Sequence, residues 1–193
     1  MYQKQSGLIL GFHGCDKKVQ QQVINSPSNL LVHSKNNYDW LGHGIYFWVN
    51  SPHRALQFAR EAKRRGADIN NPAVIGAVID LGKCLDLLDS ENLGLVKAAY
   101  SELKDVFDKA GQPLPQNIAP EGSKKRDLLL RPLDCLVIEH LLKNSDFDSV
   151  RGLFPEGNEL YPGAGLREKD HIQICIRNSN CIKGYFLPRK TEC

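Results

Sequence analysis

Two short glycine-flanked segments carry the side chains best suited to chemistry. Residues 11–14 read Gly-Phe-His-Gly, and residues 40–48 read Trp-Leu-Gly-His-Gly-Ile-Tyr-Phe-Trp. Glycine lets a backbone approach a ligand closely or adopt a positive φ. His13 offers an imidazole that donates or accepts hydrogen bonds, and Tyr46 offers an aromatic face. Together the two segments predict two walls of a slot for a flat, polar ring.

Each segment alone also has a plain structural explanation. A histidine in an apolar run is most often a satisfied core or surface residue. Tyr46 and Phe47 in a β-like run are more often ordinary core residues. The order and spacing of the two segments together favour a functional interpretation over these explanations.

The pair of segments resembles the ADP-ribosyltransferase superfamily, in particular its His-Tyr-Glu branch of poly- and mono-ADP-ribose polymerases and diphtheria-type toxins. In that family a His-Gly on the first core strand is followed by Gly-x-Gly-Ile-Tyr-Phe and then by an alanine-rich helix. Residues 51–59, Ser-Pro-His-Arg-Ala-Leu-Gln-Phe-Ala, match that helix. The resemblance is strong over residues 7–60, weaker over 146–187 and absent between them.

The resemblance implies a single ADP-ribosyltransferase-like domain over residues 1–193, of the α/β (α+β) class. Two small, mostly antiparallel sheets would surround an NAD+ cleft, with a helical insertion at about 89–143. A length of 193 residues with 41% hydrophobic residues suits one well-buried domain.

Local signals place the elements that must position the motif residues. We expect a strand over 7–12, a helix capped by Asp16 that ends near Asn25, and a strand over 72–81. Ser51 followed by Pro52 predicts a helix that runs to about residue 65 and ends at Gly66. Helices are expected over about 90–110 and 126–143, the second disturbed before Pro132. The alternating runs 171–177 and 181–187 predict a C-terminal β-hairpin.

The third catalytic position of the resembled family falls on the run 171–177. Ile172, Ile174 and Ile176 share one face there, and Gln173 is the polar residue in the middle of the other. We assign Gln173 to this position, with Asp170 and Glu168 as the rival candidates. Because glutamine keeps the hydrogen-bond acceptor of a glutamate without its charge, polymer elongation and glycohydrolysis are less expected than a single transfer.

A long loop after residue 148 matches the segment that faces the acceptor in the resembled family. It holds Arg151, Glu156, Glu168 and Asp170 among glycines and prolines. Glu168 or Asp170 would deprotonate the incoming nucleophile. The simpler explanation is a solvated connection, although an irregular loop of this length is usually functional or disordered.

The composition of the chain bears on whether it binds a membrane, a metal or a nucleic acid. No apolar run approaches the ~20 residues of a membrane span, so no membrane partner is expected. The six cysteines show no zinc-type spacing, which predicts free thiols, a cytoplasmic location and no metal. The net charge of +3 permits contact with nucleic acid without arguing for it. The basic run 63–65 suits a solvated helix end or a phosphate contact.

The resemblance therefore implies an NAD+-dependent mono-ADP-ribosyltransferase. His13 would hold ribose hydroxyls, the Gly14 backbone would pair with the nicotinamide carboxamide, and Gly44 would lie against the cofactor. Tyr46 would stack on the nicotinamide, and Gln173 would bind the reacting ribose. The acceptor would be a protein or a nucleic acid, and the chain would be a bacterial or phage-defence toxin with a cognate inhibitor or antitoxin. The alternatives are an NAD+ glycohydrolase and a catalytically inactive NAD- or ADP-ribose-binding module.

Overall fold

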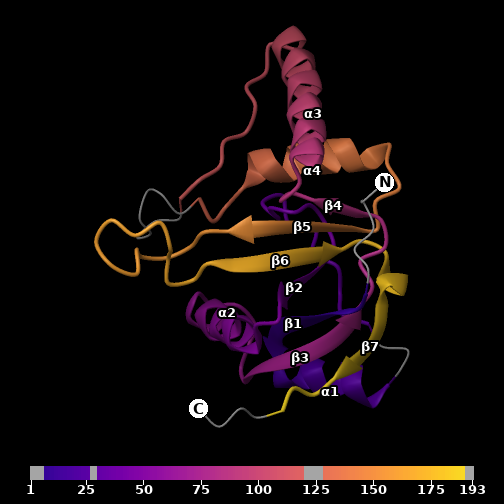
Figure 1. Ribbon diagram of the computed structural model, residues 1–193, viewed down its shortest axis with the longest axis vertical. Helices are drawn as coiled ribbons and strands as arrows, with labels where there is room; N and C mark the ends of the chain where they lie inside the picture. Colours follow the sequence, from indigo (N-terminus) through magenta and orange to yellow (C-terminus); the bar gives the residue numbers. More distant parts are fainter. Residues whose placement is uncertain (1–6, 27–29, 120–127, 190–193) are drawn as a thin grey trace.

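The computed structural model describes residues 7–26, 30–119 and 128–189. Within these ranges the strands form one hydrogen-bonded sheet in the order β4-β5-β6-β2-β1-β3-β7 (Figure 1). The strands span Ile9–Asp16 (β1), Ile45–Val49 (β2), Pro72–Ile79 (β3), Cys84–Asp86 (β4), Ser149–Phe154 (β5), His171–Ile176 (β6) and Ile182–Phe186 (β7). Every pairing is antiparallel except that between β4 and β5. The predicted α+β class with mostly antiparallel strands is confirmed.

The sheet has a narrow junction at its centre. Strands β1 and β2 pair only at Gly11 with Val49 and at Phe12 with Trp48. By contrast, β1 pairs with β3 along its whole length, from Ile9 to Asp16. The two small sheets that were predicted are therefore two halves of one sheet, because these two residue pairs join them.

Four helices and one short 3-10 turn accompany the sheet in the described ranges. They span Lys17–Asn25 (α1), Pro52–Arg64 (α2), Ser90–Lys109 (α3), Pro132–Lys143 (α4) and Ser179–Cys181 (η1). The side chains of Asp16, Ser51 and Asp89 accept hydrogen bonds from backbone amides in the first turns of α1, α2 and α3. These caps explain why the sequence places the three helix starts correctly.

The helices cover the two halves of the sheet differently. Val23 of α1 packs with Ile75 of β3, whereas Ala55 of α2 packs with Phe12 and Trp48, so α1 and α2 lie on opposite faces of the β1–β3 half. Helices α3 and α4 pack on each other at the β4–β5 end, and α3 extends away from the sheet (Figure 1).

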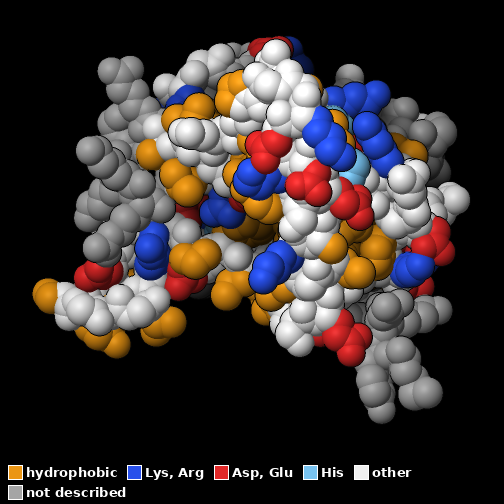
Figure 2. Space-filling model, turned by 90° about the horizontal axis from the view of Figure 1, so that it is seen from above, with side chains coloured by type: hydrophobic (Ala, Val, Ile, Leu, Met, Phe, Trp, Pro, Cys, Tyr) orange, Lys and Arg blue, Asp and Glu red, His pale blue; other side chains and the backbone are white. Residues whose placement is uncertain are grey.

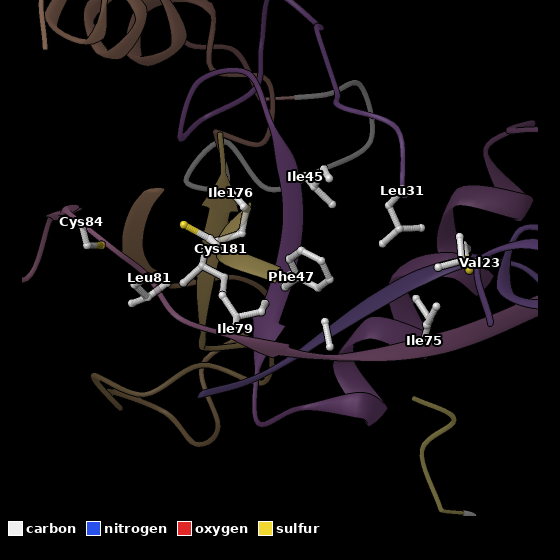
Figure 3. Close-up of a cluster of buried hydrophobic side chains, with 13 residues drawn as sticks. Val23, Leu31, Ile45, Phe47, Ile75, Ile79, Leu81, Cys84, Ile176 and Cys181 are labelled. Carbon is white, nitrogen blue, oxygen red and sulfur yellow. The ribbon is translucent and has the colours of Figure 1, made fainter. Parts of the chain in front are cut away.

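The largest apolar cluster lies on the α1 face of the sheet. Its buried side chains come from α1, five of the strands and the connections between elements (Figure 3). Phe47 at the centre of β2 is fully buried there, beside Ile45 and Ile79. This cluster joins the two halves across the narrow β1–β2 pairing, so the halves form one packed core.

Two predictions about the chain path are wrong. The runs 171–177 and 181–187 form no hairpin, because β6 pairs with β2 and β5 while β7 pairs with β3 at the far edge. The turn η1 carries the chain between these sites. Helix α4 begins at Pro132 rather than running through it, since proline suits the first helical turn and disfavours helix before it. The predicted start at residue 126 lies outside the described residues.

No helix in the described parts of the chain is both long and apolar enough to cross a bilayer. The same ranges hold no group of three or more His, Cys, Asp or Glu side chains arranged to bind a metal ion.

Candidate functional site

The two motif segments meet at the sheet junction. Once β1 and β2 stop pairing at Phe12 and Trp48, the next carbonyls of β2 need other partners. The His13 ring supplies one, with Nδ1 2.8 Å from the carbonyl oxygen of Tyr46. The His13 side chain therefore bridges the strands where the backbone ladder has ended.

This hydrogen bond determines the tautomer of the neutral His13 ring. A carbonyl only accepts, so Nδ1 carries the hydrogen and donates it, which leaves Nε2 as the acceptor of a neutral ring. Burial lowers the pKa of His13, although the bond to the Tyr46 carbonyl opposes the shift. The ring is half-buried by its exposed surface. His13 thus offers a hydrogen-bond acceptor at neutral pH.

Tyr46 uses its hydroxyl to hold the glycine-rich turn before it. The hydroxyl donates to the carbonyl of Gly42 at 2.8 Å and accepts from the amide of Leu41 at 2.9 Å. Gly42 has φ +77°, a conformation that L side chains rarely adopt. Burial raises the pKa of Tyr46 well above its usual value. A ligand at Tyr46 would meet the half-buried ring rather than the hydroxyl.

Tyr46 and Gln173 lie on the same face of the sheet. Residues paired across antiparallel strands share a face, and successive residues alternate. Trp48 pairs with Gln173. Tyr46 lies two positions before Trp48 and therefore shares this face.

His13 points to the other face. Phe12 pairs with Trp48, so His13, the next residue, faces the opposite way. Its ring lies edge-on to Phe47, with 5.9 Å between the ring centroids. The expectation that the side chains of His13, Tyr46 and Gln173 line one cleft needs correction, because His13 reaches Tyr46 through the backbone carbonyl alone.

The structure gives Gln173 a partner inside the protein. Its Oε1 accepts a hydrogen bond from Trp40 Nε1 at 2.6 Å, and the residue is only 3% exposed. Strand β6 is central and covered on both faces. Cys175, which shares a face with Gln173, is therefore as buried as Ile174 and Ile176 on the other face. The alternation of polar and apolar residues therefore does not separate a solvent face from a core face here.

The residues predicted to face the acceptor are mostly bonded within the protein. Arg151 lies in β5 rather than in a loop and pairs with Asp86 at 2.7 Å. Glu156 is buried, and its Oε2 lies 2.6 Å from the Arg54 guanidinium. Glu168 accepts from the Asn158 amide group at 2.9 Å. Asp170 accepts from the backbone amide of Arg167 at 2.9 Å, which closes a local turn.

The two predicted cofactor glycines are required by packing. A Cβ at Gly14 would lie 2.1 Å from the Ala55 carbonyl oxygen, because α2 crosses β1 there. A Cβ at Gly44 would lie 2.5 Å from Cys175 Sγ. The close backbone approach predicted for a ligand is thus made by the protein itself at both positions.

A partly buried polar and aromatic cluster beside Gln173 was not foreseen from the sequence. Trp40 stacks on Phe154 with centroids 3.8 Å apart, and the Arg131 guanidinium lies 4.8 Å from the Trp40 ring. His171 lies among the same rings, 6.0 Å from Trp40. The placement of Trp40 just before the glycine-rich motif is the one signal in the sequence that points to this cluster.

Polar side-chain atoms without a partner gather in this cluster. In the described ranges, the buried side-chain polar atoms without a hydrogen-bond partner are Trp48 Nε1, Arg54 Nε and Nη1, and His171 Nε2. The Arg54 guanidinium lies 5.8 Å from the Trp48 ring, which in turn lies 6.1 Å from His171. Burial lowers the pKa of His171. These side chains therefore surround one small polar region, with donors from Trp48 and Arg54 and an acceptor from His171, beside the loop that follows β5.

A cysteine, a histidine and a glutamate also line up near the turn before β2. Cys135 Sγ lies 3.9 Å from His43 Nε2, and His43 Nδ1 lies 3.6 Å from Glu139 Oε2. Burial raises the pKa of Cys135 to about 11. The thiol is therefore protonated at neutral pH and unsuited to nucleophilic attack.

Two grooves of the structure lie away from the junction. One, of about 660 Å³, follows the outer side of α2. The other, of about 770 Å³, lies between α3, α4 and β5 and includes Trp40, Phe154 and Arg131 in its lining. Neither is lined by His13, Tyr46 or Gln173.

Comparisons with known proteins add a distant relative. The chain is 25% identical, over 194 aligned residues, to the uncharacterized protein MJ0359 of Methanocaldococcus jannaschii, covering 89% of this chain and 83% of that protein. No family model matches the chain. No solved structure matches it either. The similarity carries no functional assignment.

Proposed function

We propose that the protein is an NAD+-dependent mono-ADP-ribosyltransferase. The observation that supports this best is the bond from His13 Nδ1 to the Tyr46 carbonyl at the sheet junction. It joins the two segments that resemble the family and leaves His13 Nε2 as an acceptor. NAD+ is rich in hydroxyl donors on its two riboses, which such an acceptor would bind.

In this proposal the protein acts mainly by positioning NAD+ and not by supplying a charged catalytic group. His13 Nε2 accepts a ribose hydroxyl, and Gln173 acts through Trp40. Because the Tyr46 ring lies on the other face of the sheet, it supports the nicotinamide only if NAD+ passes through the gap where β1 and β2 stop pairing. The bond between nicotinamide and C1′ breaks with its electrons leaving on nicotinamide. A nucleophile of the acceptor then attacks C1′ and loses its proton. The enzyme would act in the cytoplasm and, by analogy alone, as a toxin held silent by a cognate inhibitor.

A second candidate, an inactive NAD- or ADP-ribose-binding module, is favoured by one specific observation. The Gln173 oxygen is committed to Trp40, and the loop carboxylates Glu156, Glu168 and Asp170 are each bonded inside the protein. Each of these candidate carboxylates for the third motif position among the described residues therefore already has a partner inside the protein. Such a site would retain binding without turnover.

Incubation with NAD+ labelled in its adenosine part, together with a cell lysate divided into protein, DNA and RNA, separates these outcomes. Label on a macromolecule with matching nicotinamide release supports the transferase. Release without labelled macromolecule indicates the glycohydrolase, and binding without release indicates the module. Absence of both binding and release would refute the NAD+ proposal.

Two variants test the assigned roles. His13→Ala should reduce turnover strongly because a ribose hydroxyl loses its acceptor. Tyr46→Ala should remove a stacking contact worth ~1–3 kcal/mol. Lys109→Ala, an exposed position at the end of α3, serves as the control. Unchanged turnover in both folded junction variants would contradict these roles.

A further inference from the structure

A basic groove follows the outer side of α2. Its lining residues are His53, Gln57, Arg60, Lys63, Arg64 and Pro72. Three of them carry permanent positive charges, and none carries a carboxylate. The groove is therefore locally positive, although the whole chain has a net charge of only +3.

The sequence of α2 accounts for the groove. Positions 53, 57, 60 and 64 are spaced by four, three and four residues, which places them on one side of the helix. The opposite side, with Ala55, Ala59 and Ala62, is buried against the sheet. Helix α2 thus presents a continuous polar and basic stripe to solvent.

The arginines of the stripe are accessible to a ligand. Arg60 and Arg64 are exposed, and across residues 7–26, 30–119 and 128–189 no carboxylate lies within ion-pair distance of either. Lys63 donates to the carbonyl of Asn70, a bond that keeps its charge at the groove. The guanidinium groups can therefore make forked bonds to phosphate oxygens without breaking bonds in the protein.

We propose that this groove binds the phosphodiester backbone of a nucleic acid. The stripe from His53 to Arg64 is about 17 Å long at 1.5 Å per residue, enough to meet several successive phosphates. The groove is open to solvent along α2, so an extended strand can lie in it. On the face seen from the α3 end, by contrast, Lys and Arg are interspersed with Asp and Glu (Figure 2).

One end of the groove lies beside the C-terminal end of β1. Pro72, at one end of the lining, pairs with Asp16 at the end of β1. Gly14 lies two positions before Asp16, or about 7 Å along the strand. Lys17 and Lys18 are exposed at the same end. A nucleic acid that extends past this end of the groove would approach the strand that carries His13 and Gly14. Its role as the acceptor rests on the proposed function, whereas its binding does not.

Binding is tested without NAD+, by fluorescence anisotropy with a labelled single-stranded RNA, the same sequence as DNA, and a duplex. The variant Arg60→Gln/Arg64→Gln removes two groove charges. We expect about tenfold weaker binding at low salt and a salt slope smaller by about 1.4–1.8, the value for two lost phosphate contacts. The RNA and DNA arms show which backbone is preferred.

The matched control is Lys97→Gln/Lys109→Gln, which removes two exposed charges from α3. It should bind nucleic acid nearly as the parent chain does. Equal losses in both variants would show nonspecific attraction and overturn the proposal, as would a parent chain that binds none of the oligonucleotides. Circular dichroism and thermal unfolding confirm that both variants are folded.

Further arms separate this proposal from other anionic ligands and from the proposed enzyme activity. If anionic lipid vesicles bind through Arg60 and Arg64 while oligonucleotides do not, the proposal fails. It also fails if the arginine variant loses NAD+ binding and keeps nucleic-acid binding, because the groove would then hold the dinucleotide. Intact oligonucleotide binding without label transfer from NAD+ would refute the acceptor role and leave the binding site standing.

Discussion

The sheet junction and the α2 groove differ in how far the protein satisfies its own polar groups. At the junction, His13, Tyr46 and Gln173 each bond to another part of the chain. In the groove, Arg60 and Arg64 are exposed and bond to no carboxylate among the described residues. The motif residues therefore support the fold first, and the groove is the region left open to a partner.

This difference restricts what the junction can contribute to ligand binding. Since His13 Nδ1, the Tyr46 hydroxyl and the Gln173 oxygen are engaged, a ligand would have to use other groups, such as His13 Nε2, the Gln173 amide nitrogen or the Tyr46 ring. Substitutions at the junction should consequently change stability as well as turnover. Substitutions in the groove should change binding alone.

The largest effect expected at the junction comes from Gly14→Ala. The new Cβ would lie 2.1 Å from the Ala55 carbonyl, so α2 would have to move away from β1. We expect the free energy of unfolding to fall by about 3 kcal/mol. Gly94→Ala is the control, because nothing lies within 4 Å of a Cβ there and alanine favours a helix by about 0.5–1 kcal/mol. Urea unfolding measures both, and a stable Gly14→Ala would contradict the close packing.

Tyr46→Phe should give the next largest loss. It removes the hydroxyl that bonds to Leu41 and Gly42, leaving buried backbone groups unpaired at a cost of about 1–3 kcal/mol. Tyr185→Phe is the matched control, because its hydroxyl makes a longer bond of 3.4 Å to the Leu31 amide. Turnover of NAD+ should survive in folded Tyr46→Phe, since only the ring meets the ligand. A complete loss of turnover would assign the hydroxyl a direct role.

Gln173→Ala and Trp40→Phe should show energetic coupling. Each removes one side of the bond between Trp40 Nε1 and Gln173 Oε1, so the double variant should be less destabilised than the sum of the two by about 1 kcal/mol. Independent effects would mean that the bond is unimportant.

Nicotinamide release separates the candidates for the third motif position. Gln173→Ala should abolish release if Trp40 must be held in place, whereas Asp170→Ala should spare it. The inverse pattern would identify Asp170 as the catalytic acid, and full release by Gln173→Ala would refute the choice of Gln173.

Local signals in the sequence predict the elements well. Asp16, Ser51 and Asp89 are recognisable caps, and the three helices begin beside them. Pro132 is the exception. We expected it to disturb the middle of a helix, whereas it begins helix α4, and the local sequence is consistent with either position. Such signals act over a few residues and need no knowledge of the rest of the chain.

The contacts that build the site could not be predicted in this way. The Trp40–Gln173 bond joins residues 133 positions apart, and the direction of His13 depends on its register with β2 and β3. The hairpin prediction failed for the same reason, since a short turn between two alternating runs does not specify their partners. Alternation is also uninformative in β6, where neighbours cover both faces.

Stability should also fall below about pH 6.5. Burial lowers the pKa of both His13 and His171 from the ordinary value of 6.5. Between the lowered pKa and 6.5, the unfolded chain binds more protons than the folded one, so stability decreases as the pH falls through this window. Each such histidine contributes up to about 1.4 kcal/mol per pH unit to the slope.

Groups next to each histidine also shift the pKa values of His171 and His13. His171 faces Arg54, which opposes its protonation, and Glu156 and Asp170, which favour it. His13 bonds to the Tyr46 carbonyl, which also favours protonation but is outweighed by burial. Urea unfolding at pH 7.5 and 5.5 should therefore show a smaller difference in His13→Gln than in the parent chain. An equal difference would mean that His13 is protonated as readily in the folded chain as in the unfolded one. The junction would then be open to water, and its contrast with the groove would disappear.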